Sequence, residues 1–233
     1  MATIVLVHGA FHGGWCWRAA ARLLRDDGHE VHTPSLTGLA ERSHLLSAAV
    51  DLDTHIADIV NLLQWEELDE VVLVAHSYGG LPVTGAADAC VRRLAALVYL
   101  DAYTPEDGQS GLAVRSAEPG YLPLAEPVDG IAIPPPAAAV FGLSGALAER
   151  AERLMTPHPA ATLTQPIRLT GAWRRVPRKL YIRTAQFTAP YFDRYYEAAA
   201  ADPAWTAVRA EVPHNVLMTD PAWFVGQLCR HVL

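Results

Sequence analysis

The stretch Val71-Val72-Leu73-Val74-Ala75-His76-Ser77-Tyr78-Gly79-Gly80 decides the fold of this chain. Its first five residues form an apolar run, which is typical of a strand buried on both faces of a parallel sheet. A helix is expected after the turn, to about Cys90. Because Ala75 and Gly79 are small, the strand and the helix can approach each other closely while the turn residue is held in a strained backbone conformation. The segment therefore predicts Ser77, at the turn, as a nucleophile.

Apolar strands alternate with helices on both sides of this turn. Strands are expected at 4–7, 30–33, 94–100, 179–183 and 207–212, and helices at 15–25, at 192–201 and after an N-cap at Asp53. Such alternation implies a parallel sheet connected by right-handed crossovers. The expected fold class is therefore α/β: a single domain over residues 1–233, with a mostly parallel sheet of about six strands flanked by helices.

A long insertion, approximately 103–177, follows the fourth strand. It contains Pro134-Pro135-Pro136 and a helical stretch at 145–154. The insertion is too long for a simple connection within a compact domain, and segments of this kind commonly serve as lids. A flexible linker is the alternative, but the many Leu, Ala and Val residues indicate that the segment packs. We expect a helical cap over the active site.

Composition limits the partners of the chain. Its 233 residues carry a net charge of −7, with 51% hydrophobic and 18% charged residues. An acidic globular chain without a basic stripe is a poor candidate for nucleic-acid binding, so a small-molecule substrate is expected and no nucleic acid. A homodimer remains an open alternative.

The chain also lacks signals for export, membranes and metals. No basic, apolar leader precedes the first strand, and no apolar run reaches the roughly 20 residues that span a bilayer. Cys16, Cys90 and Cys229 are widely spaced and form no C-x-x-C pair, so neither a disulfide framework nor a zinc site is indicated. We expect a cytoplasmic protein with no membrane partner, no metal and no cofactor.

A serine hydroxyl needs a general base, and His214 is the best candidate. It lies in Val212-Pro213-His214-Asn215, just after the last expected strand and before a terminal helix. When the catalytic residues follow the chain order Ser, acid, His, the base is expected at that place. The other histidines are interpreted as surface or packing residues. Among them, His8 is expected to brace its turn, and His76 to direct its side chain away from Ser77.

The acid that orients the base is harder to assign. The loop after the expected strand at 179–183 reads Thr184-Ala185-Gln186-Phe187 and has no carboxylate. Asp101 ends the preceding strand, nearer Ser77, and a carboxylate there can orient an imidazole on the same rim. We therefore predict Asp101, with Asp193 and Asp220 as the alternatives.

Two backbone N–H groups are expected beside Ser77. His8-Gly9-Ala10-Phe11 follows the first strand, which should neighbour the strand of the serine. The N–H groups of Ala10 and Tyr78 can therefore form an oxyanion hole for a tetrahedral intermediate.

The chain resembles the α/β-hydrolase branch of bacterial carboxylesterases, plant methylesterases and hydroxynitrile lyases. The similarity rests on residues 8–17 (HGAFHGGWCW), on the turn at Ser77 and on the segment 99–102 (YLDA). It implies an oxyanion hole at Ala10 and Tyr78. Plant members carry their acid where this chain has Phe187, whereas similar bacterial sequences keep an Asp at the position of Asp101. The lysine and threonine that the plant lyases use are absent, so cyanohydrin cleavage is not expected.

The sequence favours hydrolysis of a carboxylic ester of a small apolar or aromatic compound through an acyl-enzyme. Two alternatives stay open: a lyase, lactonase or cyclase on the same scaffold, and a non-catalytic binding protein. Aromatic side chains are expected to line the substrate pocket under the cap. The candidates are Phe11, Tyr103, Trp173 and Phe187.

Overall fold

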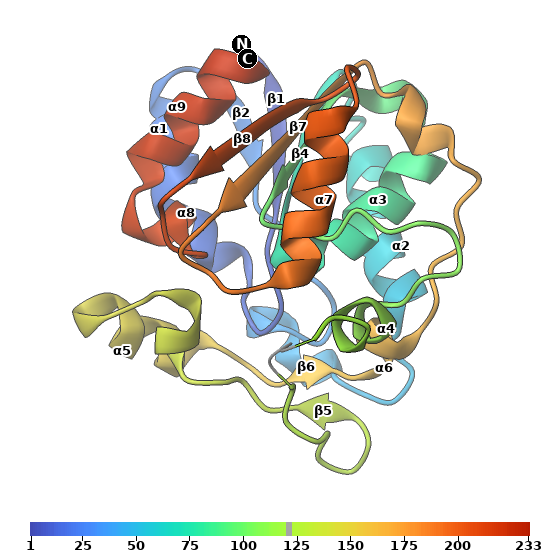
Figure 1. The fold of residues 1–233 in the computed structure, drawn as a ribbon, viewed down its shortest axis with the longest axis vertical. Coiled ribbons are helices and arrows are strands. Elements are labelled where there is room, and N and C mark those ends of the chain that lie inside the picture. Colours follow the sequence, from blue (N-terminus) through green and yellow to red (C-terminus); the bar gives the residue numbers. More distant parts are fainter. Residues whose placement is uncertain (120–122) are drawn as a thin grey trace.

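A twisted parallel sheet forms the centre of the molecule (Figure 1). The computed structural model describes residues 1–119 and 123–233, and in this part of the chain six parallel strands pair in the order β2-β1-β3-β4-β7-β8. The strands are β1 (Thr3–Val7), β2 (Glu30–His32), β3 (Val71–His76), β4 (Leu94–Leu100), β7 (Arg178–Thr184) and β8 (Thr206–Ala210). The predicted α/β fold with about six strands is confirmed.

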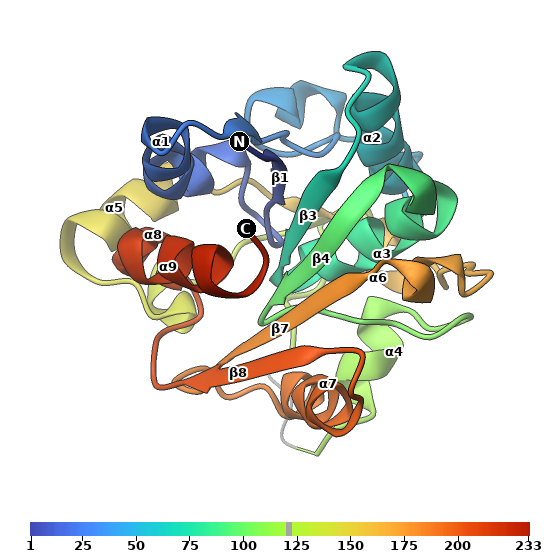
Figure 2. The same ribbon diagram turned by 90° about the horizontal axis from the view of Figure 1, so that it is seen from above.

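Helices cover both faces of this sheet, as Figure 2 shows. They are α1 (Arg18–Asp26), α8 (Val216–Thr219) and α9 (Pro221–His231) on one face, and α2 (Leu52–Trp65), α3 (Gly80–Ala89) and α7 (Pro190–Ala201) on the other. Because both faces are covered, every residue of the central strands β3 and β4 is buried. This explains why these strands are continuous apolar runs.

Two helix starts differ from the sequence prediction. The first helix is split into a 3₁₀ segment, Gly14–Trp17, and then α1. The N-cap of α2 is Asp51 instead of Asp53: the Asp51 carboxylate accepts a hydrogen bond from the Thr54 N–H at 2.9 Å, and the Thr54 side chain accepts one from the Asp51 N–H. This reciprocal pair satisfies two backbone donors, which an N-cap at Asp53 would leave open.

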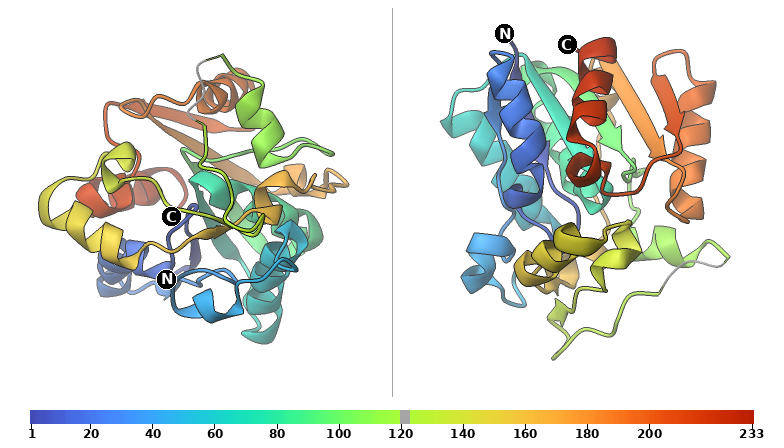
Figure 3. Two further views of the ribbon diagram at one scale, coloured as in Figure 1. Left: turned by 90° about the horizontal axis from the view of Figure 1, so that it is seen from below. Right: turned by 90° about the vertical axis from the view of Figure 1, so that its left-hand side faces the viewer.

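The insertion between β4 and β7 lies across the carboxyl ends of the strands (Figures 1 and 3). Its elements are α4 (Gly111–Ser116), β5 (Ala132–Ile133), α5 (Gly145–Leu154), β6 (His158–Pro159) and α6 (Ala161–Thr164). The helix predicted at 145–154 is confirmed. Ile133, Leu143 and Leu163 are buried, so this part of the insertion packs against the rest of the chain and is not a free linker.

Within the described residues, no helix combines the length and the apolar character needed to cross a bilayer.

Candidate active site

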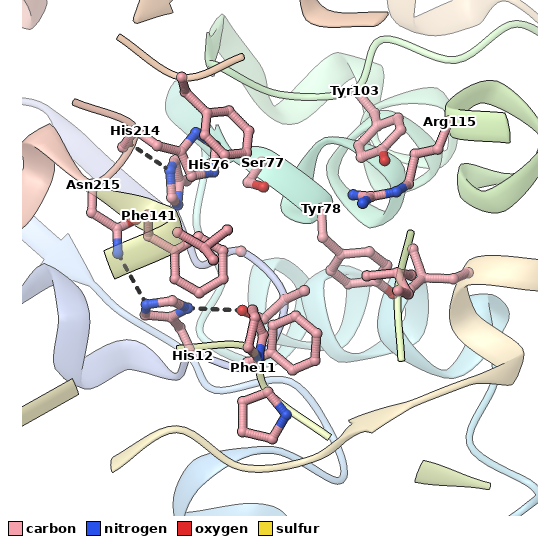
Figure 4. A pocket seen from close by; sticks show the side chains of 18 of the residues that line it. Phe11, His12, His76, Ser77, Tyr78, Tyr103, Arg115, Phe141, His214 and Asn215 are labelled. Atoms are coloured by element: carbon pink, nitrogen blue, oxygen red, sulfur yellow. Dashed lines mark hydrogen bonds between the residues drawn. The ribbon is translucent and has the colours of Figure 1, made fainter. Parts of the chain in front are cut away.

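Ser77 occupies a sharp turn between β3 and α3. Its φ is +54°, a left-handed conformation that side-chain-bearing residues rarely adopt. Two nearby glycines allow the turn to pack closely against neighbouring backbone. A Cβ on Gly79 would lie 2.7 Å from the His8 carbonyl oxygen, and one on Gly80 would lie 2.0 Å from the Tyr103 carbonyl oxygen. The turn presents the Ser77 hydroxyl to a cavity at the carboxyl edge of the sheet (Figure 4).

Strained backbone is repeated at this edge. Phe11, just beyond β1, has a φ of +67°, and Asp101, the residue after β4, has a φ of +45°. Each such conformation costs on the order of 1–3 kcal/mol, and such outliers gather at functional sites. The segments that follow three neighbouring strands, β1, β3 and β4, therefore each contain a strained residue.

His214 and Asp101 form a buried pair. The Nδ1 atom of His214 lies 2.7 Å from Oδ2 of Asp101, and both side chains are almost completely buried. The carboxylate also accepts hydrogen bonds from the Arg183 guanidinium at 2.8 Å and from the N–H and hydroxyl of Thr184. These donors hold the carboxylate in place and balance its charge. Because Nδ1 carries the proton of this bond, Nε2 is left unprotonated and can accept a proton.

The other two candidate acids are engaged elsewhere. Asp193 accepts hydrogen bonds at 2.9 Å from both Arg183 and Arg209. Asp220 caps α9 by accepting from the Trp223 N–H at 3.0 Å. The structure thus brings Asp101 to His214, and places Asp193 and Asp220 in other interactions.

Aromatic rings enclose the His214 imidazole. The ring of Phe187 stacks on it at 4.1 Å between centroids, and Phe141 and Phe192 each lie 6.0 Å away. Phe187 thus covers one face of the His214 imidazole. These rings exclude water from the imidazole and restrict its rotation.

The expectation for His76 is wrong. Its ring lines the same cavity as Ser77 and lies 4.5 Å from the ring of His214 (Figure 4). Its Nε2 atom donates to the His214 carbonyl at 3.1 Å, and this hydrogen bond holds the His76 side chain beside His214. Burial, followed by the neighbouring His214, lowers the pKa of His76 well below 6.5, so its imidazole stays neutral.

The two residues predicted to supply the oxyanion donors line the same cavity. Ala10 and Tyr78 both line it, and Tyr78 lies in the first turn of a helix, where N–H groups have no partner within the helix. No backbone hydrogen bond from Ala10 N–H is present in the described part of the chain. His12 links the loop of Ala10 to the loop of His214. Its Nδ1 donates to the Ala10 carbonyl at 2.8 Å, and its Nε2 accepts from the Asn215 side-chain amide at 3.1 Å.

His8 braces its turn as the sequence predicts. Its Nδ1 donates to the Gly9 carbonyl at 2.8 Å, and its Nε2 accepts from the Leu36 N–H at 3.0 Å. With both nitrogens engaged, His8 fixes the loop that carries Ala10.

The cavity encloses about 110 Å³ and is lined mainly by apolar side chains. Three of the four predicted pocket residues line it: Phe11, Tyr103 and Phe187. Trp173 does not. It lies in a 3₁₀ segment, Ala172–Arg175, where its N–H donates to Asp88 at 3.0 Å and its ring packs against Trp205.

Sequence reasoning missed part of the lining. Phe141, Arg115 and Tyr191 also face the cavity, and two of them come from the insertion. Within residues 1–119 and 123–233, His, Cys, Asp and Glu side chains form no group of three arranged to hold a metal ion.

Comparison with known proteins identifies the family. The family model described as "Alpha/beta hydrolase family" matches residues 4–227. The chain belongs to the alpha/beta hydrolase family. This hydrolase is 36% identical to "Carbendazim hydrolyzing esterase" of Nocardioides sp. (strain SG-4G), over 95% of this chain and 96% of that protein. It is also 33% identical to "Methylesterase 9" of Arabidopsis thaliana, over 46% of this chain and 42% of that protein.

Solved structures share the fold of this hydrolase. An extracellular alpha/beta-hydrolase from a Paenibacillus species superposes with a TM-score of 0.79 at 22% identity, covering 100% of this chain and 99% of the other. A methylesterase from Arabidopsis gives a TM-score of 0.79 at 23% identity, covering 99% and 98%. Sequence identity at this level supports a common fold but does not establish a common reaction.

Proposed function

We propose that this protein hydrolyses a carboxylic ester of a small apolar or aromatic compound through an acyl-enzyme, with Ser77 as nucleophile, His214 as general base and Asp101 as orienting acid. The observation that carries the proposal is the buried 2.7 Å contact between His214 and Asp101 beside the strained turn of Ser77. The names of two relatives support it: a carbendazim hydrolyzing esterase and a plant methylesterase.

In the first half-reaction, the Ser77 oxygen attacks the carbonyl carbon of the ester while Nε2 of His214 takes the hydroxyl proton. The carbonyl oxygen becomes an oxyanion, which the N–H groups of Ala10 and Tyr78 stabilise. Asp101 stabilises the imidazolium. The C–O bond of the ester then breaks, and the departing alkoxide leaves as the alcohol after it receives the proton from His214.

In the second half-reaction, water attacks the acyl group on Ser77 while His214 takes one water proton. The second oxyanion collapses, the acyl–oxygen bond to Ser77 breaks, and His214 returns the proton to the serine. The products are a carboxylic acid and free enzyme, so the two half-reactions require neither an oxidant nor a metal.

We also propose that the residues between β4 and β7 act as a cap on this site. Pro123, Val140 and Phe141 of this segment line the cavity that contains Ser77. A cap of this kind limits access of water to the acyl-enzyme and selects the substrate by its shape.

A fluorophosphonate probe tests the nucleophile directly. Mass spectrometry of labelled, proteolysed wild type should find the probe on Ser77, and Ser77→Ala should not be labelled. Ser47→Ala is the matched control, because Ser47 is exposed and lies outside the cavity. Absence of label on a folded wild-type sample would contradict the proposal.

The same variants separate hydrolysis from a lyase or cyclase reaction on this scaffold. Hydrolysis through an acyl-enzyme predicts that Ser77→Ala loses about 10⁶-fold in kcat. A reaction that needs only His214 as base would retain measurable turnover in that variant. A pure binding protein would leave the ester intact during prolonged incubation with the wild type.

A further inference from the structure

Two buried side chains, His12 and Asn215, connect the loop of Ala10 to the loop of His214 (Figure 4). The proposed acyl-enzyme chemistry gives neither of them a role. Building on the proposed ester hydrolysis, we infer that His12 and Asn215 are positioning residues for the oxyanion hole. They hold the Ala10 N–H in the orientation that stabilises a tetrahedral intermediate.

The direction of the Ala10 N–H depends on two successive peptide planes. A trans peptide is planar, so the Ala10 N–H points opposite to the Gly9 carbonyl, which accepts a hydrogen bond from His8 at 2.8 Å. In the next peptide, the Ala10 carbonyl accepts from Nδ1 of His12 at 2.8 Å. Because the two planes meet at the Cα of Ala10, fixing both planes also fixes the backbone dihedral angles between them.

The backbone beside Ala10 is strained and depends on such contacts. Phe11, the next residue, has a φ of +67°, and a strained conformation persists only where the surrounding structure over-determines it. The Phe11 carbonyl accepts from the Thr156 N–H at 3.0 Å, and the Ala10 carbonyl is held by His12. Loss of the His12 hydrogen bond should therefore let the loop relax and the Ala10 N–H change direction.

Asn215 determines which nitrogen of His12 can donate. The Ala10 carbonyl can only accept, so Nδ1 of His12 carries a proton. Burial lowers the pKa of His12 to about 4, so the imidazole is neutral and its Nε2 keeps a lone pair. The side-chain amide of Asn215 donates to this Nε2 at 3.1 Å. Asn215 thus stabilises the one neutral tautomer of His12 that can hold the Ala10 carbonyl.

The surroundings of His12 and Asn215 leave both side chains little freedom. They are 2% and 1% exposed, respectively. The ring of His12 stacks on Trp15 at 5.2 Å between centroids and meets the ring of Phe141 edge-on at 5.3 Å. The backbone N–H of Asn215 donates to the Phe141 carbonyl at 3.2 Å, which fixes the residue directly after His214. One chain of hydrogen bonds thus keeps the base and the oxyanion hole in a fixed relation.

Substitutions that remove the two donors test this positioning role. His12→Phe keeps an aromatic ring but cannot donate to the Ala10 carbonyl. It should lower kcat for p-nitrophenyl butyrate by about 10²-fold, the lower end of the effect of losing an oxyanion donor. Asn215→Leu should lower kcat about tenfold, because the tautomer of His12 is no longer fixed. KM should stay within about threefold in both variants, since the oxyanion exists only in the transition state.

Three variants serve as controls. His12→Asn should keep most of the activity, because the Asn side chain also branches at Cγ and its amide can donate to the Ala10 carbonyl from the place of Nδ1. His44→Phe and Asn61→Leu make the same substitutions at exposed positions and should keep the wild-type kcat.

A pair of ketone inhibitors separates the oxyanion hole from a general loss of structure. With a trifluoromethyl ketone, the Ser77 oxygen adds to the carbonyl carbon, the hydroxyl proton passes to His214, and the carbonyl oxygen becomes an oxyanion. A methyl ketone of the same chain length binds largely without this addition. The ratio of the two inhibition constants, measured within one variant, does not depend on the folded fraction. In His12→Phe and Asn215→Leu, the preference for the trifluoromethyl ketone should fall by about the same factor as kcat/KM.

The outcomes separate the positioning role from the proposed function. The positioning role is overturned if His12→Phe keeps kcat within about threefold of the wild type, or if kcat falls while the preference for the trifluoromethyl ketone is unchanged. It is also overturned if His12→Asn loses as much as His12→Phe. If His12→Phe does not fold, the first two criteria apply to Asn215→Leu. Ester hydrolysis by Ser77 stands in each of these cases, whereas both fail if the wild type hydrolyses no ester and Ser77 is not labelled.

Discussion

Mild acid should destabilise the folded protein, because several buried histidines are held neutral. Burial lowers the pKa of His8 to about 3 and those of His12 and His55 to about 4, and it also lowers the pKa values of His76 and His158. In the unfolded chain these imidazoles return to a pKa near 6.5. Below that pH the unfolded chain binds more protons than the folded one, so the free energy of unfolding falls as the pH falls.

The size of the effect follows from linkage. Between pH 7.5 and pH 5.5, each histidine that stays neutral in the folded state lowers the free energy of unfolding by about 1.4 kcal/mol. His8, His12 and His55 together contribute about 4 kcal/mol on this basis, a large part of the 5–15 kcal/mol typical of a domain. Although burial opposes it, hydrogen bonds lower the pKa of Asp51 and Asp88, so these carboxylates matter only below their unfolded value of about 3.8.

Urea unfolding followed by circular dichroism at pH 7.5, 6.5 and 5.5 measures this loss. His55→Gln is the informative variant, because a glutamine amide can replace the hydrogen bonds of His55 to the Thr37 carbonyl and the Tyr78 hydroxyl. The variant should lose about 1.4 kcal/mol less than the wild type over this range. His44→Gln, at an exposed position, is the control. Equal losses in His55→Gln and the wild type, or no loss in either, would refute the reasoning.

Three further predictions concern the turn after Ser77, the buried core and the hydrogen bonds of Asp101. Gly80→Ala should destabilise the protein by about 3 kcal/mol or more, because its Cβ would lie 2.0 Å from the Tyr103 carbonyl oxygen; an unchanged melting temperature would contradict this. Leu97→Ala, in the middle of β4 and fully buried, should lower the free energy of unfolding in urea by about 2–5 kcal/mol, and a loss below 1 kcal/mol would contradict the packing described. Thr184→Val removes the hydroxyl that donates to Asp101 and should lower kcat/KM for p-nitrophenyl butyrate about tenfold without unfolding the protein, whereas unchanged turnover would show that Asp101 is held without it.

The sequence carried enough information to locate the strands and the turn of Ser77. The apolar runs of β3 and β4 are long because both faces of these strands are buried, and Gly79 and Gly80 lie against backbone that leaves no room for a Cβ. Asp101 could be predicted by elimination, since the loop after β7 contains no carboxylate. The structure places that carboxylate against His214.

The remaining features depend on contacts that local patterns do not encode. Arg115 lines the cavity beside Tyr191, whose hydroxyl accepts a hydrogen bond from its guanidinium, and these two residues lie 76 positions apart in the chain. Trp173 is aromatic and lies in the insertion, but its backbone is bound to Asp88, which keeps it away from Ser77. The position of His76 depends on a hydrogen bond to a residue 138 positions later in the chain.

The proposed catalysis depends on the pairing of Asp101 with His214, and a comparison of two carboxylate variants tests this pairing most directly. The kcat for p-nitrophenyl butyrate is measured for the wild type, Asp101→Asn and Asp193→Asn, with the fold of each checked by circular dichroism. Asp101→Asn should stay folded and lose about 10⁴-fold in kcat, because Asn no longer holds the imidazole in its active tautomer. Asp193→Asn, whose carboxylate binds Arg183 and Arg209, should lose far less. Full activity in Asp101→Asn, or an equal loss in Asp193→Asn, would contradict the account.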